Sequence, residues 1–177
     1  PLIKATIFKQ FCGGESIKEC DKAIWELGKN QVGAILDYSV EGEQHEEDFS
    51  KTQKELLKVI SKAKYNDNIP VACIKLTGII RHSVLQKWSE EGIESLNSKE
   101  NEWLINGKQR LDSICKLCKE NNVPVYIDAE ESWLQIAIDE LTEEMMGKYN
   151  NEKAIVFTTI QMYRWDKLQY FKNLIQK

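Results

Sequence analysis

The chain has 177 residues, of which 42% are hydrophobic and 29% are charged, and its formal net charge is -4. The composition is that of a globular protein, and the length fits one domain with an ordinary hydrophobic core, or part of a larger one. The negative net charge argues against a nucleic-acid partner, because binding to phosphates needs a basic surface. The sequence shows no apolar run long enough to span a bilayer and no secretory signal.

Five cysteines, an odd number, predict a reducing compartment rather than a disulfide framework. Cys115 and Cys118 form a C-x-x-C pair within an amphipathic helical pattern, and we expect both thiols to face the core. No metal site is predicted. Such a site would require Asp37, Asp128 and Glu130 to converge, which the sequence leaves open.

Predicted strands and predicted helices alternate along the chain. Apolar and β-branched runs predict five strands, over residues 4–11, 32–38, 71–75, 123–128 and 154–162. Apolar residues at helical spacing predict the helices, over about 16–27, 46–65, 81–93, 98–120, 132–145 and 165–176. An acidic loop is expected at residues 41–43.

Capping-box patterns mark the starts of two of these helices, where Ser16 is followed by Glu19 and Ser132 by Gln135. Helices between successive strands predict parallel pairing. The five β/α units predict an α/β fold of the (β/α)8 TIM-barrel type that is incomplete, because such a barrel closes with eight units. An open five-stranded sheet is the alternative, although residues 12–15 match neither phosphate-binding glycine motif. We expect residues 1–177 to form a single domain.

Four of the predicted strands end on a polar residue: Asp37, Lys75, Asp128 and Gln161. In a parallel sheet or barrel the carboxyl ends of the strands share one rim, and ligands bind at that rim. These four side chains are therefore the candidate site residues.

Lys75 follows an apolar run, so a carboxylate should lie close to it, because an unpaired buried ammonium is costly. Asp128, on the neighbouring strand, is the candidate partner. Three interpretations stay open for Lys75: a structural ion pair at the rim, an anchor for a substrate carboxylate, or a Schiff-base lysine. Asp37 is interpreted as a site carboxylate or as an acceptor for loop amides. Gln161 either recognises the edge of a ring or bonds to the next strand.

The sequence resembles the proline dehydrogenase family in three segments that keep the family's order and spacing: 73–78 (CIKLTG), 126–132 (YIDAEES) and 156–163 (VFTTIQMY). Residues 36–41 and 11–15 also fit that family's barrel. The resemblance covers essentially the whole chain and the first part of the family's barrel. It implies a flavin-dependent (β/α)8 barrel that oxidises L-proline to Δ1-pyrroline-5-carboxylate by hydride transfer to FAD, with a quinone as electron acceptor.

Carried over by this resemblance, Lys75 would bind the proline carboxylate, Asp128 would organise the substrate end beside it, and Gln161 would hydrogen-bond the flavin. The resemblance also implies roughly three further β/α units, so these 177 residues alone would have little or no activity. It implies a location in the cytoplasm or at the membrane periphery in a bacterium, and in mitochondria in a eukaryote.

Two other hypotheses stay open. A Schiff-base lyase or aldolase on a similar barrel would use Lys75 as nucleophile, with Asp128 assisting proton transfer. A non-catalytic partial barrel would need a second chain to complete it.

Overall fold

A computed structural model describes residues 8, 12–38 and 45–177 of the chain. Its sheet has three parallel strands in the order β1-β2-β3, with bounds Ala72–Ile74, Val125–Ile127 and Val156–Thr158. The predicted α/β class and parallel pairing are confirmed for these strands, each of which is shorter than predicted. The predicted strand over 4–11, apart from Phe8, and the predicted loop at 41–43 lie outside the described residues.

The prediction of a strand over residues 32–38 is wrong. This segment forms no ladder, although the Ala34 N–H donates to the Asn68 carbonyl oxygen at 2.7 Å. In a parallel ladder the next donor would be the nitrogen of Pro70, which carries no hydrogen. The segment therefore meets the chain just before β1 and does not continue as a fourth strand.

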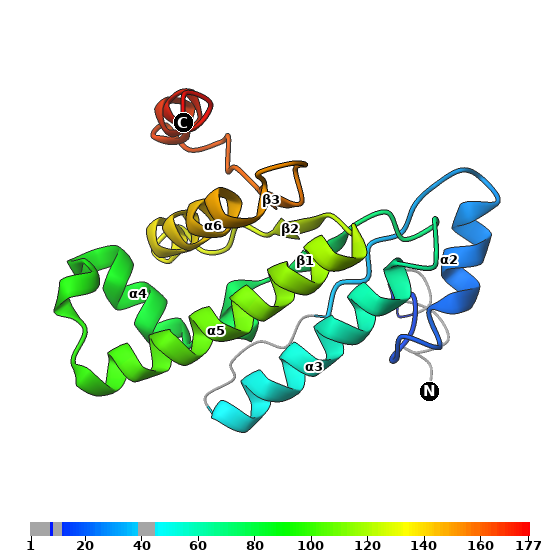
Figure 1. The fold of residues 1–177 in the computed structure, drawn as a ribbon, viewed down its shortest axis with the longest axis horizontal. Coiled ribbons are helices and arrows are strands. Elements are labelled where there is room, and N and C mark those ends of the chain that lie inside the picture. The colour runs from blue at the N-terminus through cyan, green and yellow to red at the C-terminus, as the bar shows by residue number, and fades with distance from the viewer. Residues whose placement is uncertain (1–7, 9–11, 39–44) are drawn as a thin grey trace.

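The helices match the predicted order but begin and end at somewhat different residues. They are α2 (Asp21–Gly28), α3 (Glu46–Ala63), α4 (His82–Glu91), α5 (Ser98–Asn121), α6 (Gln135–Tyr149) and α7 (Lys167–Leu174), with short 3-10 turns η2 (Leu76–Gly78) and η3 (Ile93–Ser95). Figure 1 shows the long helix α5 lying beside α3, with α6 next to the sheet. None of the helices in the described part of the chain is both long and apolar enough to cross a membrane.

Both predicted capping boxes are wrong in detail. Ser16 accepts a hydrogen bond from the Glu19 N–H, but helix α2 begins only at Asp21. Gln135 is the first residue of α6, and its side chain accepts from the Glu130 N–H instead of returning to Ser132. In each case the bonds stabilise a turn ahead of the helix.

The two faces of the sheet differ in burial because side chains alternate along each strand. One face carries Ala72, Ile74, Val125 and Ile127, each at most 1% exposed and part of the core beneath the helices. The opposite face is half open. Cys115 and Cys118 of α5 are fully buried in the same core, which confirms the prediction of core-facing thiols.

Gly107 allows α5 to approach the turn after β1. A Cβ atom at this position would lie 2.6 Å from Cγ1 of Ile80, a residue with no exposed surface. We expect Gly107→Ala to lower the free energy of unfolding by about 1–2 kcal/mol, since overpacking outweighs the gain of about 1 kcal/mol in helix propensity. Urea denaturation measures the change.

Gly147 of α6 provides the matched control, because it is exposed and a Cβ atom there would meet nothing within 4 Å. Gly147→Ala should raise the free energy of unfolding by about 1 kcal/mol. Equal stabilisation by both substitutions would show that α5 and Ile80 do not pack as described.

Candidate active site

Lys75 and Asp128 stand side by side at the carboxyl ends of β1 and β2. Ile74 pairs with Ile127, so the next residue on each strand projects onto the opposite, half-open face. The Lys75 Nζ donates to Oδ2 of Asp128 at 2.6 Å, and about a third of each side chain is exposed. The predicted contact between the two is confirmed, and both groups remain accessible from solvent.

The charge of Lys75 is stabilised by its surroundings. The hydrogen bond to Asp128 raises the pKa of Lys75 above its ordinary value, although desolvation opposes this, and the charges of Asp37 and Glu130 add to the effect. A raised pKa means that the stabilisation from this ion pair is full below the ordinary lysine pKa and is lost as the pH rises through the higher folded value. Lys75 therefore stays protonated throughout the neutral range.

Replacement of Asp128 by Asn should lower the pKa of Lys75. It removes the charge-assisted hydrogen bond and also the carboxylate whose charge acts most strongly on Lys75. A pH titration of the Lys75 side-chain NMR signals measures the change. Asp37→Asn is the control, and a smaller decrease is expected because Asp37 acts on Lys75 through its charge alone. A Lys75 pKa that is the same in Asp128→Asn and in the unsubstituted chain would contradict this description.

Gln161 lies past the end of β3 and reaches the end of β2. Its Nε2 donates to the Glu130 carbonyl oxygen, and its Oε1 accepts a 3.4 Å bond from Nη1 of Arg164. A primary amide has two N–H donors and two acceptor lone pairs. The bonds to Glu130 and Arg164 use one of each, so the Gln161 amide keeps a donor and an acceptor for the edge of a ligand.

Two contacts at the rim were missed by the sequence reasoning. The Glu130 carboxylate accepts from the Thr77 N–H at 3.1 Å and also from the Thr77 hydroxyl. Burial raises the pKa of Glu130, and the Thr77 hydrogen bonds act the other way. No sequence signal predicted them, because Thr77 lies in the 3-10 turn η2, beyond the strand register that pairs Ile74 with Ile127. Arg164, which donates to Gln161, likewise had no sequence signal.

The half-open face of the sheet presents an apolar surface next to these polar ends. Tyr126 and Phe157 meet edge to face, with ring centroids 5.4 Å apart, and Tyr126 is 37% exposed. Cys73 lies beside Tyr126 in the register, and burial raises the pKa of its thiol to about 11. A flat apolar ring system with a polar edge fits this combination, because its faces would meet the aromatic side chains and its edge the Gln161 amide.

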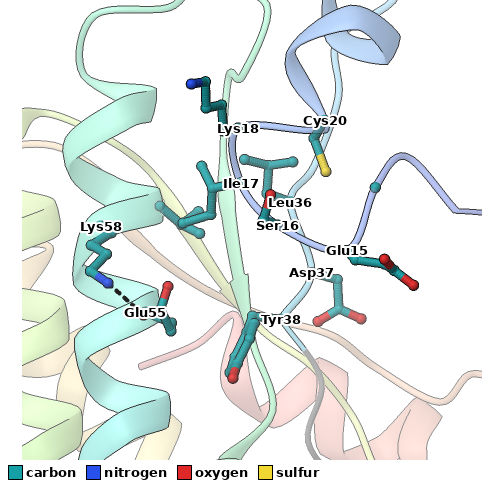
Figure 2. A pocket seen from close by; sticks show the side chains of 12 residues that line it. Glu15, Ser16, Ile17, Lys18, Cys20, Leu36, Asp37, Tyr38, Glu55 and Lys58 are labelled. Atoms are coloured by element: carbon teal, nitrogen blue, oxygen red, sulfur yellow. Dashed lines mark hydrogen bonds and ion pairs between the residues drawn. The ribbon is translucent and has the colours of Figure 1, made fainter.

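A hollow of about 470 Å³ lies between helix α3 and the segments around Ser16 and Asp37. Figure 2 shows Asp37 and Tyr38 on one wall, with Lys58 of α3 bonded to Glu55 on another. Of the predicted rim residues, only Asp37 lines it. Across residues 8, 12–38 and 45–177, no three His, Cys, Asp or Glu side chains are placed to hold a metal ion. Lys75, Asp128 and Gln161 lie instead at the ends of the strands, which are therefore the candidate active site.

Solved structures share this fold. Proline utilization A from Bdellovibrio bacteriovorus superposes with a TM-score of 0.73 over 97% of the chain, at 19% sequence identity, and the match covers 19% of that protein. Proline utilization A from Corynebacterium freiburgense gives a TM-score of 0.66 at 16% identity, covering 97% of this chain and 17% of that one.

Sequence comparisons agree with the structural ones. Proline dehydrogenase 1, mitochondrial, of Dictyostelium discoideum is 35% identical over 97% of the chain, which spans 36% of that relative's length. The carbapenem antibiotics biosynthesis protein CarD of Pectobacterium carotovorum is 26% identical over 94% of the chain, which spans 44% of its length. The sequence model of the family described as proline dehydrogenase matches residues 20–177. The chain therefore belongs to the proline dehydrogenase family.

Proposed function

We propose that this chain forms part of a (β/α)8 barrel that oxidises L-proline to Δ1-pyrroline-5-carboxylate with FAD as cofactor. The observation that carries the proposal is the Lys75–Asp128 pair, which lies at the carboxyl ends of parallel strands in a chain of this family. The carboxyl ends of the strands are where barrel enzymes bind their substrates.

Lys75 and Asp128 are proposed as the catalytic pair of the site. The protonated Lys75 would bind the proline carboxylate, since 27% of its side chain is exposed beside Asp128. Asp128 keeps Lys75 charged and aimed across the rim, since its carboxylate makes the 2.6 Å bond to Nζ. Together they would fix the substrate so that the carbon next to its unprotonated nitrogen faces the cofactor.

Gln161 is proposed as the residue that would bind the edge of the flavin, and Tyr126 and Phe157 as the aromatic side chains that would contact its ring system. The flavin, when bound, supplies the hydride acceptor, and the protein supplies orientation and electrostatics. We further propose that a quinone receives the electrons. Peripheral contact of the protein with a membrane surface is also proposed. No nucleic-acid partner is proposed.

The Schiff-base lyase is the second candidate, and the charge state of Lys75 disfavours it. An amine nucleophile must be unprotonated, and lysines that form imines have a lowered pKa. The pKa of Lys75 is raised instead, chiefly by Asp128. The non-catalytic partial barrel is disfavoured by the accessible ion pair at the rim.

A visible spectrum of the chain with FAD, recorded anaerobically before and after L-proline, tests the proposal. We expect a saturable change in the flavin spectrum on binding of L-proline, with bleaching wherever hydride transfer follows, and neither effect in Lys75→Met. Absence of any response to L-proline, together with borohydride trapping of a carbonyl compound on Lys75, would support the lyase instead.

Relatives from Dictyostelium discoideum and Schizosaccharomyces pombe are named as mitochondrial proteins. We propose the same location for this chain if its source is a eukaryote, and the cytoplasm or the membrane periphery if it is a bacterium. Fractionation of the source cells tests this.

A further inference from the structure

Glu130 connects the ends of all three strands, through three different groups. Its carboxylate accepts from the N–H and the hydroxyl of Thr77, just past β1. Its carbonyl oxygen accepts from the Gln161 side chain, just past β3. Its own N–H, just past β2, donates to Oε1 of Gln135 at 2.9 Å. No single one of these bonds is unusual, but their convergence on one residue ties the segments that carry the candidate site.

The bond to Gln135 continues into a buried polar chain. Nε2 of Gln135 donates to Oδ1 of Asp139 at 2.8 Å, and Oδ2 of Asp139 pairs with the Lys167 ammonium. All three residues are at most 5% exposed. These buried bonds therefore connect the last helix, α7, through α6 to the Glu130 N–H without passing through solvent.

This series of buried hydrogen bonds fixes which way the Gln135 amide points. The carboxylate of Asp139 can only accept, so the amide nitrogen of Gln135 faces it and the amide oxygen faces Glu130. Reversal of the amide would place oxygen against carboxylate and N–H against N–H. The orientation is thus imposed by the buried ion pair, and it holds the Glu130 backbone in one position.

We propose that Glu130 is a positioning residue that sets the placement of Gln161 relative to the Lys75–Asp128 pair, and that the Gln135–Asp139–Lys167 chain holds Glu130 in that role. The inference rests on the proposed function only in taking Gln161 as the cofactor-edge residue. The alternative is that these bonds contribute to overall stability alone. The two differ in whether a change at Glu130 acts locally at the rim or on the whole fold.

Amide hydrogen exchange of the 15N-labelled chain separates these alternatives. Glu130→Ala should accelerate exchange of the Thr77 N–H by about tenfold, because its charged acceptor is gone, and should shift the Gln161 side-chain amide signals. The reference is the Val125 N–H, which bonds to the Ile155 carbonyl oxygen at the other end of the strands and should change less than about threefold. Equal acceleration of both amides would overturn the proposal, as would an unchanged Thr77.

Three further variants sharpen the test. Glu130→Gln should restore slow exchange at Thr77, since an amide can accept from the N–H and donate to the hydroxyl. Glu131→Ala, which removes the adjacent exposed carboxylate, should leave Thr77 and Gln161 unchanged. Gln135→Leu should accelerate Thr77 exchange about threefold through the loss of its bond to Glu130, and no acceleration would overturn the part of the proposal that concerns the buried chain.

These readouts need no cofactor, so they stand apart from the proposed function. An FAD titration followed by flavin fluorescence then connects the two. Glu130→Ala keeps the main-chain carbonyl that Gln161 bonds to, but it loses the Thr77 bonds that hold this carbonyl in place. Gln161 should move with the carbonyl and the apparent FAD affinity should weaken about tenfold, whereas Glu131→Ala should leave the affinity unchanged. If the unsubstituted chain bound no FAD, the proposed function would fail, whereas the exchange data would still decide the role of Glu130.

Discussion

Replacing Lys167 by Met is expected to lower the free energy of unfolding by about 3–5 kcal/mol, because it leaves a buried carboxylate without its partner. Lys167 and Asp139 are 3% and 5% exposed, respectively, and form an ion pair between α7 and α6. Gln135 satisfies only one oxygen of Asp139, so the other would face the protein interior. Urea denaturation followed by circular dichroism measures the loss.

Two comparisons make this result specific. The double variant with Asp139→Leu should lose less stability than Lys167→Met alone, since no charge is then left unpaired. Lys58→Met makes the same substitution in an exposed pair with Glu55, where the lysine side chain is 64% exposed, and should change stability by less than about 1 kcal/mol. A loss in Lys167→Met no greater than in Lys58→Met would contradict the buried pair.

Truncation of Ile127 should cost about 2–5 kcal/mol of folding free energy, the usual range for an isoleucine replaced by alanine in a packed core. Ile127 is the last residue of the central strand β2, is 1% exposed and points toward the helices. Ile127→Ala would leave a cavity in the core that solvent does not reach. Chemical denaturation provides the measurement.

Tyr126→Ala is the control for the opposite face of the same strand. Tyr126 is 37% exposed and loses mainly its edge-to-face contact with Phe157, so a cost of about 1–2 kcal/mol is expected. A larger loss from Tyr126→Ala than from Ile127→Ala would mean that the two faces of the sheet have been assigned the wrong way round.

The ion pair at the rim was predictable from sequence because strand register is simple. Lys75 and Asp128 each follow an apolar run that ends at the same edge of a parallel sheet, and a charged residue in that position requires a partner. Burial of Cys115 and Cys118 followed from helical spacing in the same way. In these cases a local pattern determines the outcome.

Features that depend on several segments at once were not predictable. The predicted strand over residues 32–38 does not form because the nitrogen of Pro70 carries no hydrogen. This matters only once Ala34 is known to lie against Asn68. The ties from Glu130 to Thr77 and Gln161 depend on backbone groups that carry no sequence signal. Gln135 looks like a capping residue in the sequence, yet it belongs to a buried chain that ends on α7.

An FAD titration of the 15N-labelled chain, followed by NMR, tests the central claim that the open face and rim of the sheet form the cofactor side of the site. The account predicts saturable shifts at the Gln161 side-chain amide, at Tyr126 and at Lys75, with those at Tyr126 and Lys75 much weakened in Gln161→Ala. Shifts that gather instead around Ile17 and Leu36 in the hollow beside α3, or no saturable shifts at all, would contradict it.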